Sequence, residues 1–87
     1  MDNSKFPPVI LHTYLLCPPG RTVKHFMDIA KIPYTEKIYD WWGGELLSEE
    51  FQALSPTGMA PVIEDGDFVL AESAAIINYL TATRNVP

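Results

Sequence analysis

The sequence is short of cysteine, of basic residues and of long apolar runs, and each shortage excludes a class of protein. Its 87 residues include one cysteine, Cys17, so the chain can form neither an internal disulfide framework nor a cysteine-rich zinc site. Six basic side chains stand against eleven acidic ones. The resulting net charge of −5 argues against a nucleic-acid partner, which requires a basic face.

The apolar stretch near the N-terminus, residues 9–17, is too short to span a bilayer. His12 and Thr13 interrupt it, which makes it a poor signal peptide. The two histidines, His12 and His25, are not spaced from Cys17 as metal ligands are. We therefore expect no membrane partner, no metal and a cytoplasmic location in which the thiol stays reduced.

Proline and glycine, in contrast, are abundant. Eight prolines and five glycines make up 13 of the 87 residues, which disfavours a bundle of long helices and favours a turn-rich mixed fold. The length allows one small domain. Apolar residues reach 47%, which is high for a chain that can bury only part of its surface.

The first half of the chain predicts a strand, a helix and a second strand. Residues 9–14 are rich in β-branched and aromatic side chains and lie between two proline pairs, as expected for a buried strand. From residue 21 the apolar positions follow helical spacing, and Pro33 ends that helix. Residues 34–39 form the second predicted strand. Such a unit has parallel strands joined by a right-handed crossover.

The second half predicts a short helix and a hairpin. A loop at 40–45 precedes the short helix, which Ser48 can cap. Asp65-Gly66-Asp67 is a turn between two strands at 61–64 and 68–71. These elements complete an α/β chain with four strands.

A last helix follows the hairpin, from residue 74 to about 83, and Ser73 can cap it. The apolar residues of this helix cover a wide arc on a helical wheel. One side of the helix should therefore pack on the sheet, and the other should require a partner.

This element order is that of the thioredoxin-like fold, in which helices flank a four-stranded mixed sheet. Three segments narrow the resemblance, namely residues 15–21, 55–63 and 65–80. They resemble the catalytic loop, the proline-containing segment, and the glutathione-binding hairpin with its third helix in cytosolic glutathione transferases. The chain is thus similar to the N-terminal domain of that family.

Cys17 stands where the resemblance implies the catalytic group. It lies four residues before Arg21, as does the catalytic serine of the theta and delta classes, whereas a cysteine here is typical of omega-like and glutaredoxin-like members. A helix N-terminus favours the reactive thiolate, although Pro18 and Pro19 contribute no backbone N–H groups. The alternative is a small buried residue without a chemical role.

Tyr14 is the rival catalytic group, because other classes of the family use a tyrosine hydroxyl at the end of the first strand. A strand tyrosine with its ring in the core is the simpler interpretation. Trp41 and Trp42 form an unusual aromatic pair in the loop after the second strand. They could cover the sheet edge, or they could contribute to the site or to a subunit interface.

The resemblance implies that five further residues form the glutathione-binding site. It implies a cis peptide bond between Ala60 and Pro61, which leaves the backbone of Ala60 free to pair with the glutathione peptide as an added strand. Ser73, at the N-terminus of the last helix, matches a residue that binds the γ-glutamyl carboxylate. Glu72 would bind the γ-glutamyl ammonium group, and Met59 can contribute only backbone groups.

Two positions depart from the family pattern. Met59 replaces the usual glutamine or lysine, and Leu46 stands where a histidine or lysine often contacts the glycine carboxylate of glutathione. Each lost charged hydrogen bond would cost about 1.5–3 kcal/mol of binding energy. Lys37 or Arg21 could compensate, but the sequence does not place either side chain at the site.

The resemblance implies a cysteine-type glutathione transferase or thiol reductase, with glutathione as co-substrate. It divides the chain into a flexible segment 1–8, a glutathione-binding domain 9–83 and the start of an interdomain linker at 84–87. A homodimer partner or a helical second domain would complete the pocket for the second substrate. Two alternatives stay open: a non-catalytic interaction or dimerisation module, and a monothiol glutaredoxin-like protein.

Overall fold

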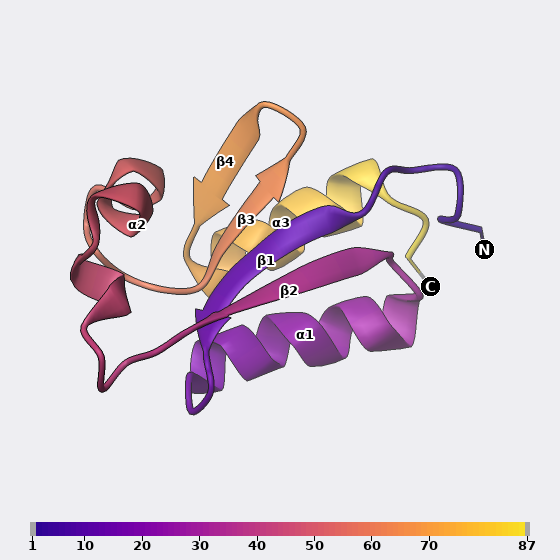
Figure 1. Cartoon of the computed structure of the whole chain (residues 1–87). Helices are drawn as coiled ribbons and strands as arrows, with labels where there is room; N and C mark the ends of the chain where they lie inside the picture. The colour runs from indigo at the N-terminus through magenta and orange to yellow at the C-terminus, as the bar shows by residue number, and fades with distance from the viewer. Residues whose placement is uncertain (1, 87) are drawn as a thin grey trace.

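A four-stranded sheet with helices on both faces forms the core of the chain (Figure 1). The computed structural model describes residues 2–86; Met1 and Pro87, at the outer ends of the predicted segment 1–8 and the predicted linker 84–87, lie outside the described residues. The elements are β1 (Val9–Tyr14), α1 (Pro18–Ala30), β2 (Tyr34–Tyr39), the 3₁₀ helix η1 (Glu45–Leu47), α2 (Glu49–Leu54), β3 (Val62–Asp65), β4 (Phe68–Ala71) and α3 (Ser73–Thr83). The predicted thioredoxin-like α/β fold is confirmed.

The strand order across the sheet is β2-β1-β3-β4. β1 and β2 are parallel, as strands joined by a helical crossover should be. β3 is antiparallel to both of its neighbours, and Val62 at its start is paired with His12 of β1 and Ala71 of β4. This register brings the end of β1, the start of β3 and the end of β4 to one end of the sheet.

The two faces of the sheet bury different cores, because successive residues of a strand point to opposite faces. α1 and α3 pack on the face that carries Leu11 and Ile63, and η1 and α2 pack on the face that carries Val62. The larger core contains Val9, Leu11, Val23, Met27, Ala30, Ile32, Ile63, Ile76 and Leu80. The smaller core contains Tyr39, Leu46, Phe51 and Val62.

α1 begins earlier than its apolar spacing indicates. Pro18 and Pro19 occupy its first two positions, where a helix has no acceptor for backbone N–H groups and the φ angle of proline is already helical. Cys17 is the N-cap residue. It therefore lies at the junction of strand and helix, as the sequence predicts.

The predicted cap of α2 is confirmed, because Ser48 Oγ accepts a hydrogen bond from the Phe51 N–H at 3.2 Å. The 3₁₀ helix η1 has no signal in the sequence. At α3 the predicted cap is wrong by one residue, since Ser73 is the first helical residue and Glu72 is the N-cap, without a side-chain cap hydrogen bond.

The prediction that α3 exposes an apolar side is also wrong. Its apolar residues Ile76 and Leu80 are buried, and Ile77 and Tyr79 pack against the larger core. Among the described residues, the large exposed apolar side chains lie on other elements: Ile10, Leu15, Leu16, Ile29, Ile38, Trp41, Trp42, Leu47, Met59, Phe68 and Val69. The exposed apolar surface is therefore divided between loops and the other elements, and none of these large side chains lies on the last helix.

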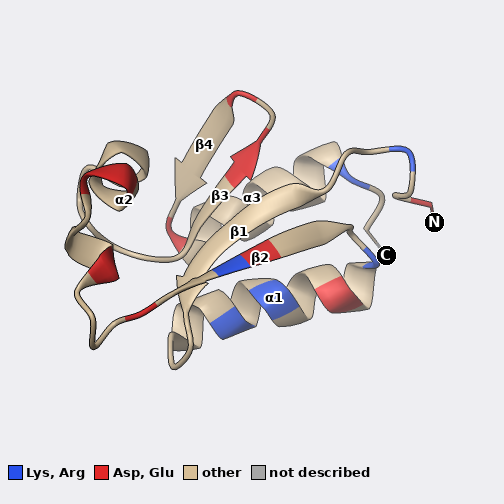
Figure 2. Cartoon of the chain, viewed as in Figure 1, with Lys and Arg blue, Asp and Glu red and all other residues tan. Residues whose placement is uncertain are grey.

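Charged side chains are unevenly distributed over the elements (Figure 2). The hairpin, η1 and α2 carry acidic residues and no basic ones, whereas α1 and β2 carry residues of both signs. Within residues 2–86, no helix is both long and apolar enough to cross a membrane.

Candidate functional site

Three loops converge at the end of the sheet where β1 stops (Figure 1). Cys17 follows β1, the Ala60–Pro61 pair precedes β3, and the Glu72–Ser73 pair follows β4. The strand register makes this convergence unavoidable, since His12 faces Val62 and Val62 faces Ala71. The predicted site residues lie up to 56 positions apart in the sequence and are thus brought to the same end of the sheet.

Cys17 lies deep in this junction and is 1% exposed. Its N–H donates to the carbonyl of Tyr14 at 3.1 Å, and its carbonyl accepts from the N–H of Arg21 at 3.0 Å. A Cβ atom on Gly20 would lie 3.2 Å from Cys17 Sγ and 2.2 Å from Thr13 Oγ1. Glycine at position 20 therefore lets the first turn of α1 approach β1 and the thiol closely.

Tyr14 and Cys17, the two rival catalytic groups, are neighbours in the structure. Burial raises the pKa of Tyr14, and the neighbouring Cys17 acts in the same direction. The Tyr14 hydroxyl therefore stays protonated near neutral pH. It can donate a hydrogen bond to the cysteine sulfur.

The Ala60–Pro61 peptide bond is cis, and Pro61 is buried. Ser55, which is fully buried, holds the chain just before this bond. Its Oγ donates to the Met59 carbonyl at 2.8 Å and accepts from the Met59 N–H at 3.1 Å. The backbone of Met59 is thus already paired, while its side chain is 67% exposed.

Ser55 is a positioning residue that sequence reasoning misses. The segment around Ser55 reads as a chain break, because its proline and glycine are turn residues. The usable signal is a serine that stands four residues before Met59, within reach of a tight turn. Only the tertiary structure shows that this hydroxyl faces back into the loop.

Glu72 carries the other backbone feature of the site. Its φ of 74° and ψ of 125° lie in a region that residues other than glycine rarely adopt. Such conformations persist where the surrounding structure imposes them, and they cluster at ligand sites. The Glu72 carbonyl accepts the N–H of Ile76 at 2.9 Å, so this residue joins β4 directly to α3.

The three residues considered for the glycine carboxylate lie in different places. Leu46 is buried in the smaller core. Lys37 is paired with Glu50 of α2, with Nζ 2.5 Å from Oε1. Arg21 is exposed on α1. Leu46 and Lys37 therefore offer no free cation to the site, whereas Arg21 lies near the end of β1, where it lines a pocket with Thr13 and Gly20.

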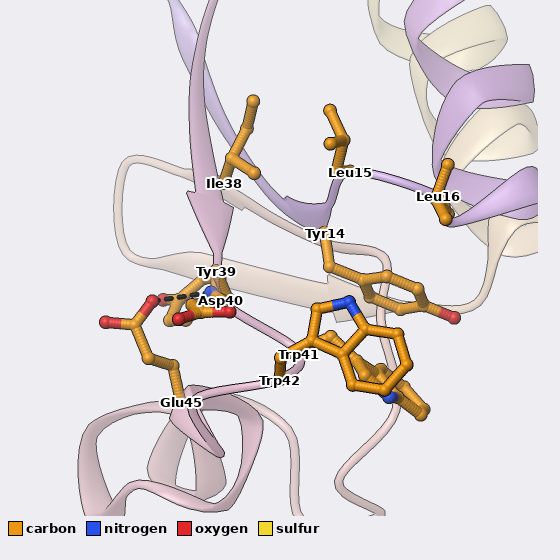
Figure 3. Close-up of a pocket in the computed structure, with 9 residues that line it drawn as sticks. All are labelled: Tyr14, Leu15, Leu16, Ile38, Tyr39, Asp40, Trp41, Trp42 and Glu45. Carbon is orange, nitrogen blue, oxygen red and sulfur yellow. Dashed lines mark hydrogen bonds between the residues drawn. The ribbon is translucent and has the colours of Figure 1, made fainter.

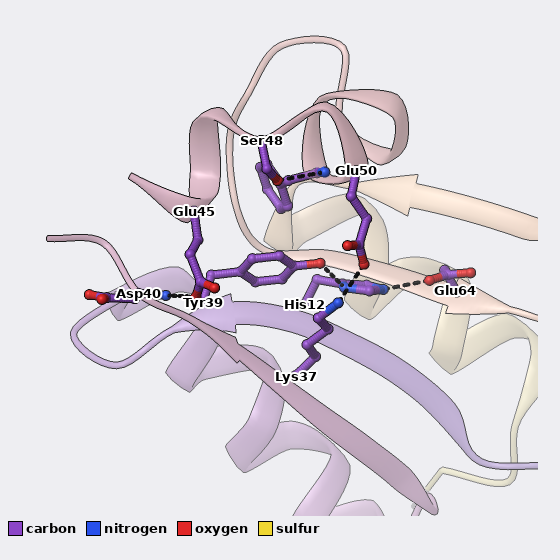
Figure 4. A network of polar contacts seen from close by, with 9 residues as sticks. His12, Lys37, Tyr39, Asp40, Glu45, Ser48, Glu50 and Glu64 are labelled. Atoms are coloured by element: carbon purple, nitrogen blue, oxygen red, sulfur yellow. Dashed lines mark hydrogen bonds and ion pairs between the residues drawn. The ribbon is translucent and has the colours of Figure 1, made fainter. Parts of the chain in front are cut away.

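A buried polar network lies on the α2 face of the sheet (Figure 4). His12 Nδ1 lies 2.8 Å from the Tyr39 hydroxyl, and His12 Nε2 lies 2.5 Å from Glu64 Oε1. Burial raises the pKa of Tyr39, so its hydroxyl can donate to Nδ1 while Nε2–H donates to Glu64. The sequence signals His12 only as an interruption of an apolar strand.

The fold defines a thioredoxin-like domain, and the family model for the N-terminal domain of glutathione S-transferases matches residues 11–87. Human glutathione S-transferase theta-1 is 40% identical over 77 residues, which cover 88% of this chain and 32% of the relative. Mouse theta-2 is 37% identical over 76 residues, which cover 87% and 31%. The chain belongs to the glutathione S-transferase family.

Solved structures agree with this assignment. A glutathione transferase homologue from a Drosophila species, solved with bound glutathione, superimposes with a TM-score of 0.84 at 36% identity, covering 87% of this chain and 35% of that one. A serine-to-cysteine mutant of a poplar glutathione transferase superimposes with a TM-score of 0.83 at 26% identity, covering 88% and 36%. The chain spans about a third of the length of these relatives.

Proposed function

We propose that this domain binds glutathione and presents Cys17 for glutathione transfer or thiol–disulfide exchange, as part of a cysteine-type glutathione transferase. The observation that carries the proposal is the strand register, which gathers Cys17, the Ala60–Pro61 pair and the Glu72–Ser73 pair at one sheet edge. An edge that combines a thiol, free backbone groups and a helix N-terminus suits a short anionic thiol peptide.

Each residue has a role in this proposal. The backbone of Ala60, shaped by Pro61, pairs with the cysteinyl part of glutathione as an added strand. Ser73 and the first N–H groups of α3 bind the γ-glutamyl carboxylate. Glu72 binds the γ-glutamyl ammonium group. Met59, whose backbone is held by Ser55, contributes to the wall of the site rather than a further hydrogen bond.

The chemical step is an exchange of one disulfide for another. The Cys17 thiolate attacks one sulfur of oxidised glutathione, the bond between the two glutathione sulfurs breaks, and the second glutathione leaves as a thiolate. The Tyr14 hydroxyl, protonated near neutral pH, stands beside Cys17 and would stabilise the sulfur by donating a hydrogen bond to it. Glutathione is the co-substrate, and no metal takes part in the proposed step.

We also propose a cellular location, a domain organisation and a partner for this chain. Its single thiol suits a reducing cytoplasm. The chain is proposed to consist of a segment 1–8, a glutathione-binding domain 9–83 and the start of an interdomain linker at 84–87. A homodimer partner or a helical domain, as implied by the family, would complete the pocket for the second substrate.

A second candidate is a non-catalytic interaction or dimerisation module. The burial of Cys17, which is 1% exposed, favours it, because a nucleophile must be reached by its substrate. The burial of Leu46 favours it as well, since the glycine carboxylate then lacks a cation. The family match favours both candidates over a monothiol glutaredoxin-like protein.

Intact-mass analysis after incubation with oxidised glutathione tests the proposal. We expect one glutathione per chain, removed by a reductant, and none on the Cys17→Ser variant. If the wild-type chain binds reduced glutathione by calorimetry but forms no adduct, the domain is a binding module. If it does neither, both the thiol chemistry and the proposed glutathione site are wrong.

A further inference from the structure

Met59 places an accessible sulfur beside the proposed glutathione site. Of the two methionines within residues 2–86, Met27 is fully buried in the larger core, whereas Met59 is 67% exposed. Met59 directly precedes Ala60, whose backbone is proposed to pair with glutathione. Peroxides oxidise an accessible methionine thioether to a sulfoxide. An oxidant dissolved in water therefore reaches the sulfur of Met59 and not that of Met27.

The main chain of Met59 is fixed, so a change in its side chain need not move the site. Ser55 Oγ donates a hydrogen bond to the Met59 carbonyl at 2.8 Å and accepts one from the Met59 N–H at 3.1 Å. Ser55 itself is fully buried, which keeps its hydroxyl in this position. Any effect of oxidation on ligand binding should therefore come from the polarity of the side chain rather than from a displaced loop.

We propose that Met59 is an oxidation site whose sulfoxide weakens the binding of glutathione, an inference that rests on the proposed function. The oxidant is a small hydroperoxide such as hydrogen peroxide. The sulfur lone pair attacks one peroxide oxygen, and an S–O bond forms as the O–O bond breaks. The leaving hydroxide takes the proton of the transferred oxygen and becomes water. The sulfur is oxidised by two electrons, and the peroxide is reduced by two.

Two physical effects give the direction of the change. The sulfoxide replaces an apolar group by a polar one, and its oxygen accepts hydrogen bonds but donates none. Glutathione that covers this wall would remove water from that oxygen, which costs free energy unless a donor replaces the water. The oxygen also carries partial negative charge and faces a peptide whose net charge is negative. Oxidation of Met59 should therefore lower the affinity for glutathione by about fivefold or more.

Peptide mapping tests the selectivity of the oxidation. Because peroxides also oxidise thiols, the experiment uses the Cys17→Ser variant. After treatment with hydrogen peroxide, trypsin places Met27 on peptide 25–31 and Met59 on peptide 38–84. Mass spectrometry should find one added oxygen on the second peptide, assigned to Met59 by fragmentation, and none on the first.

Calorimetry with reduced glutathione measures the effect on binding. The treated Cys17→Ser chain should bind glutathione about fivefold or more weakly than the untreated chain, and methionine sulfoxide reductases should restore the affinity. The matched control carries Met59→Leu in the same background, since leucine has a similar volume and no sulfur. Its affinity should be the same before and after peroxide treatment.

The two tryptophans report whether oxidation disturbs the fold. Trp41 and Trp42 both line the cavity between the loop after β1 and the loop after β2, and Met59 does not line it (Figure 3). Their fluorescence should therefore be unchanged by the treatment. A change would mean that the peroxide has disturbed the structure, and it would overturn the explanation through the Met59 side chain.

Three further results would overturn the inference. They are equal oxidation of Met27 and Met59, an affinity that oxidation leaves unchanged, and an equal loss of affinity in the Met59→Leu control. An unchanged affinity would leave the proposed function standing, because the untreated chain still binds glutathione. If the untreated chain does not bind glutathione, the proposed glutathione site and the effect of oxidation on it fail together, and peptide mapping alone decides whether Met59 is the oxidation site.

Discussion

At the scale of single residues, burial separates side chains of one type into different roles. The chain has two histidines: His12 is 3% exposed and hydrogen bonded at both ring nitrogens, whereas His25 is exposed on α1. A buried polar group stabilises a fold only while its partners are present. His12 therefore ties β1 to Tyr39 of β2 and to Glu64 of β3.

The His12→Leu variant tests this role. It leaves the buried Tyr39 hydroxyl and the Glu64 carboxylate without a partner, so the free energy of unfolding should fall by about 1–3 kcal/mol. Urea denaturation measures the change. The control is His25→Leu, which should change the free energy by less than about 0.5 kcal/mol. Equal effects of the two variants would show that the network contributes nothing.

At the scale of elements, the hairpin is joined to the end of α3 by Asp65, the last residue of β3. The Tyr79 hydroxyl donates to Asp65 Oδ2 at 2.5 Å, and Arg84 Nη2 donates to Oδ1 at 3.0 Å. The ring of Phe68 stacks on Tyr79, with centroids 4.7 Å apart. The hairpin therefore covers Tyr79, whereas Ile76 and Leu80 of α3 are buried in the larger core.

This ion pair predicts a pH dependence of stability. Burial opposes the ionised form of Asp65, but the hydrogen bonds from Tyr79 and Arg84 and the charge of Arg84 outweigh it and lower its pKa below the usual 3.8. A carboxyl whose pKa is lower in the folded state stabilises the fold above its unfolded value. That stabilisation is lost as the pH falls through the folded value.

The Asp65→Asn variant should therefore lose about 1.5–3 kcal/mol of unfolding free energy at neutral pH. The deficit should shrink as the pH falls below 3.8, because the wild-type carboxyl is then protonated as well. Urea titrations at several pH values measure it, with Asp67→Asn in the same turn as the control. A deficit that does not depend on pH would contradict the assigned cause.

At the scale of the whole molecule, hydrogen bonds join the N-terminal segment to the residues that follow α3. Asn3 is 2% exposed, and its Nδ2 donates to the carbonyls of Ala30 and Asn85, each at 3.0 Å. The Asn85 N–H donates back to Asn3 Oδ1 at 2.9 Å. The guanidinium of Arg84 also lies 4.4 Å from the centre of the Phe6 ring. No residue spacing in the sequence signals these contacts.

The Asn3→Ala variant should lower the free energy of unfolding by about 1–3 kcal/mol, because it removes the partner of the buried Ala30 carbonyl and of the part-buried carbonyl and N–H of Asn85. Amide hydrogen exchange of Asn85 should accelerate as well. Asn78→Ala, an exposed change on α3, serves as the control and should not destabilise the domain. An unchanged stability of Asn3→Ala would instead match a flexible segment 1–8.

Much of the fold is readable from local chemistry. The proline pairs around 9–14, the helical spacing that follows, and the Asp-Gly turn at Asp65 each predict an element that the structure contains. The site is readable only where a motif carries it, as at Cys17 and the Ala60–Pro61 pair. Ser55 and His12 carry no such motif, because a lone polar residue does not reveal which groups it will meet.

By itself, the sequence determined the element types and their order, the absence of an internal disulfide, and the identity of the thiol. These follow from local backbone preferences and from composition, which act over a few residues. The tertiary structure alone decided that Cys17 is buried against Gly20, that the apolar face of α3 is covered, and that Trp41 and Trp42 lie in one cavity with Tyr14. Burial and neighbouring charge depend on contacts between distant segments, and only strand register and helix packing create those contacts.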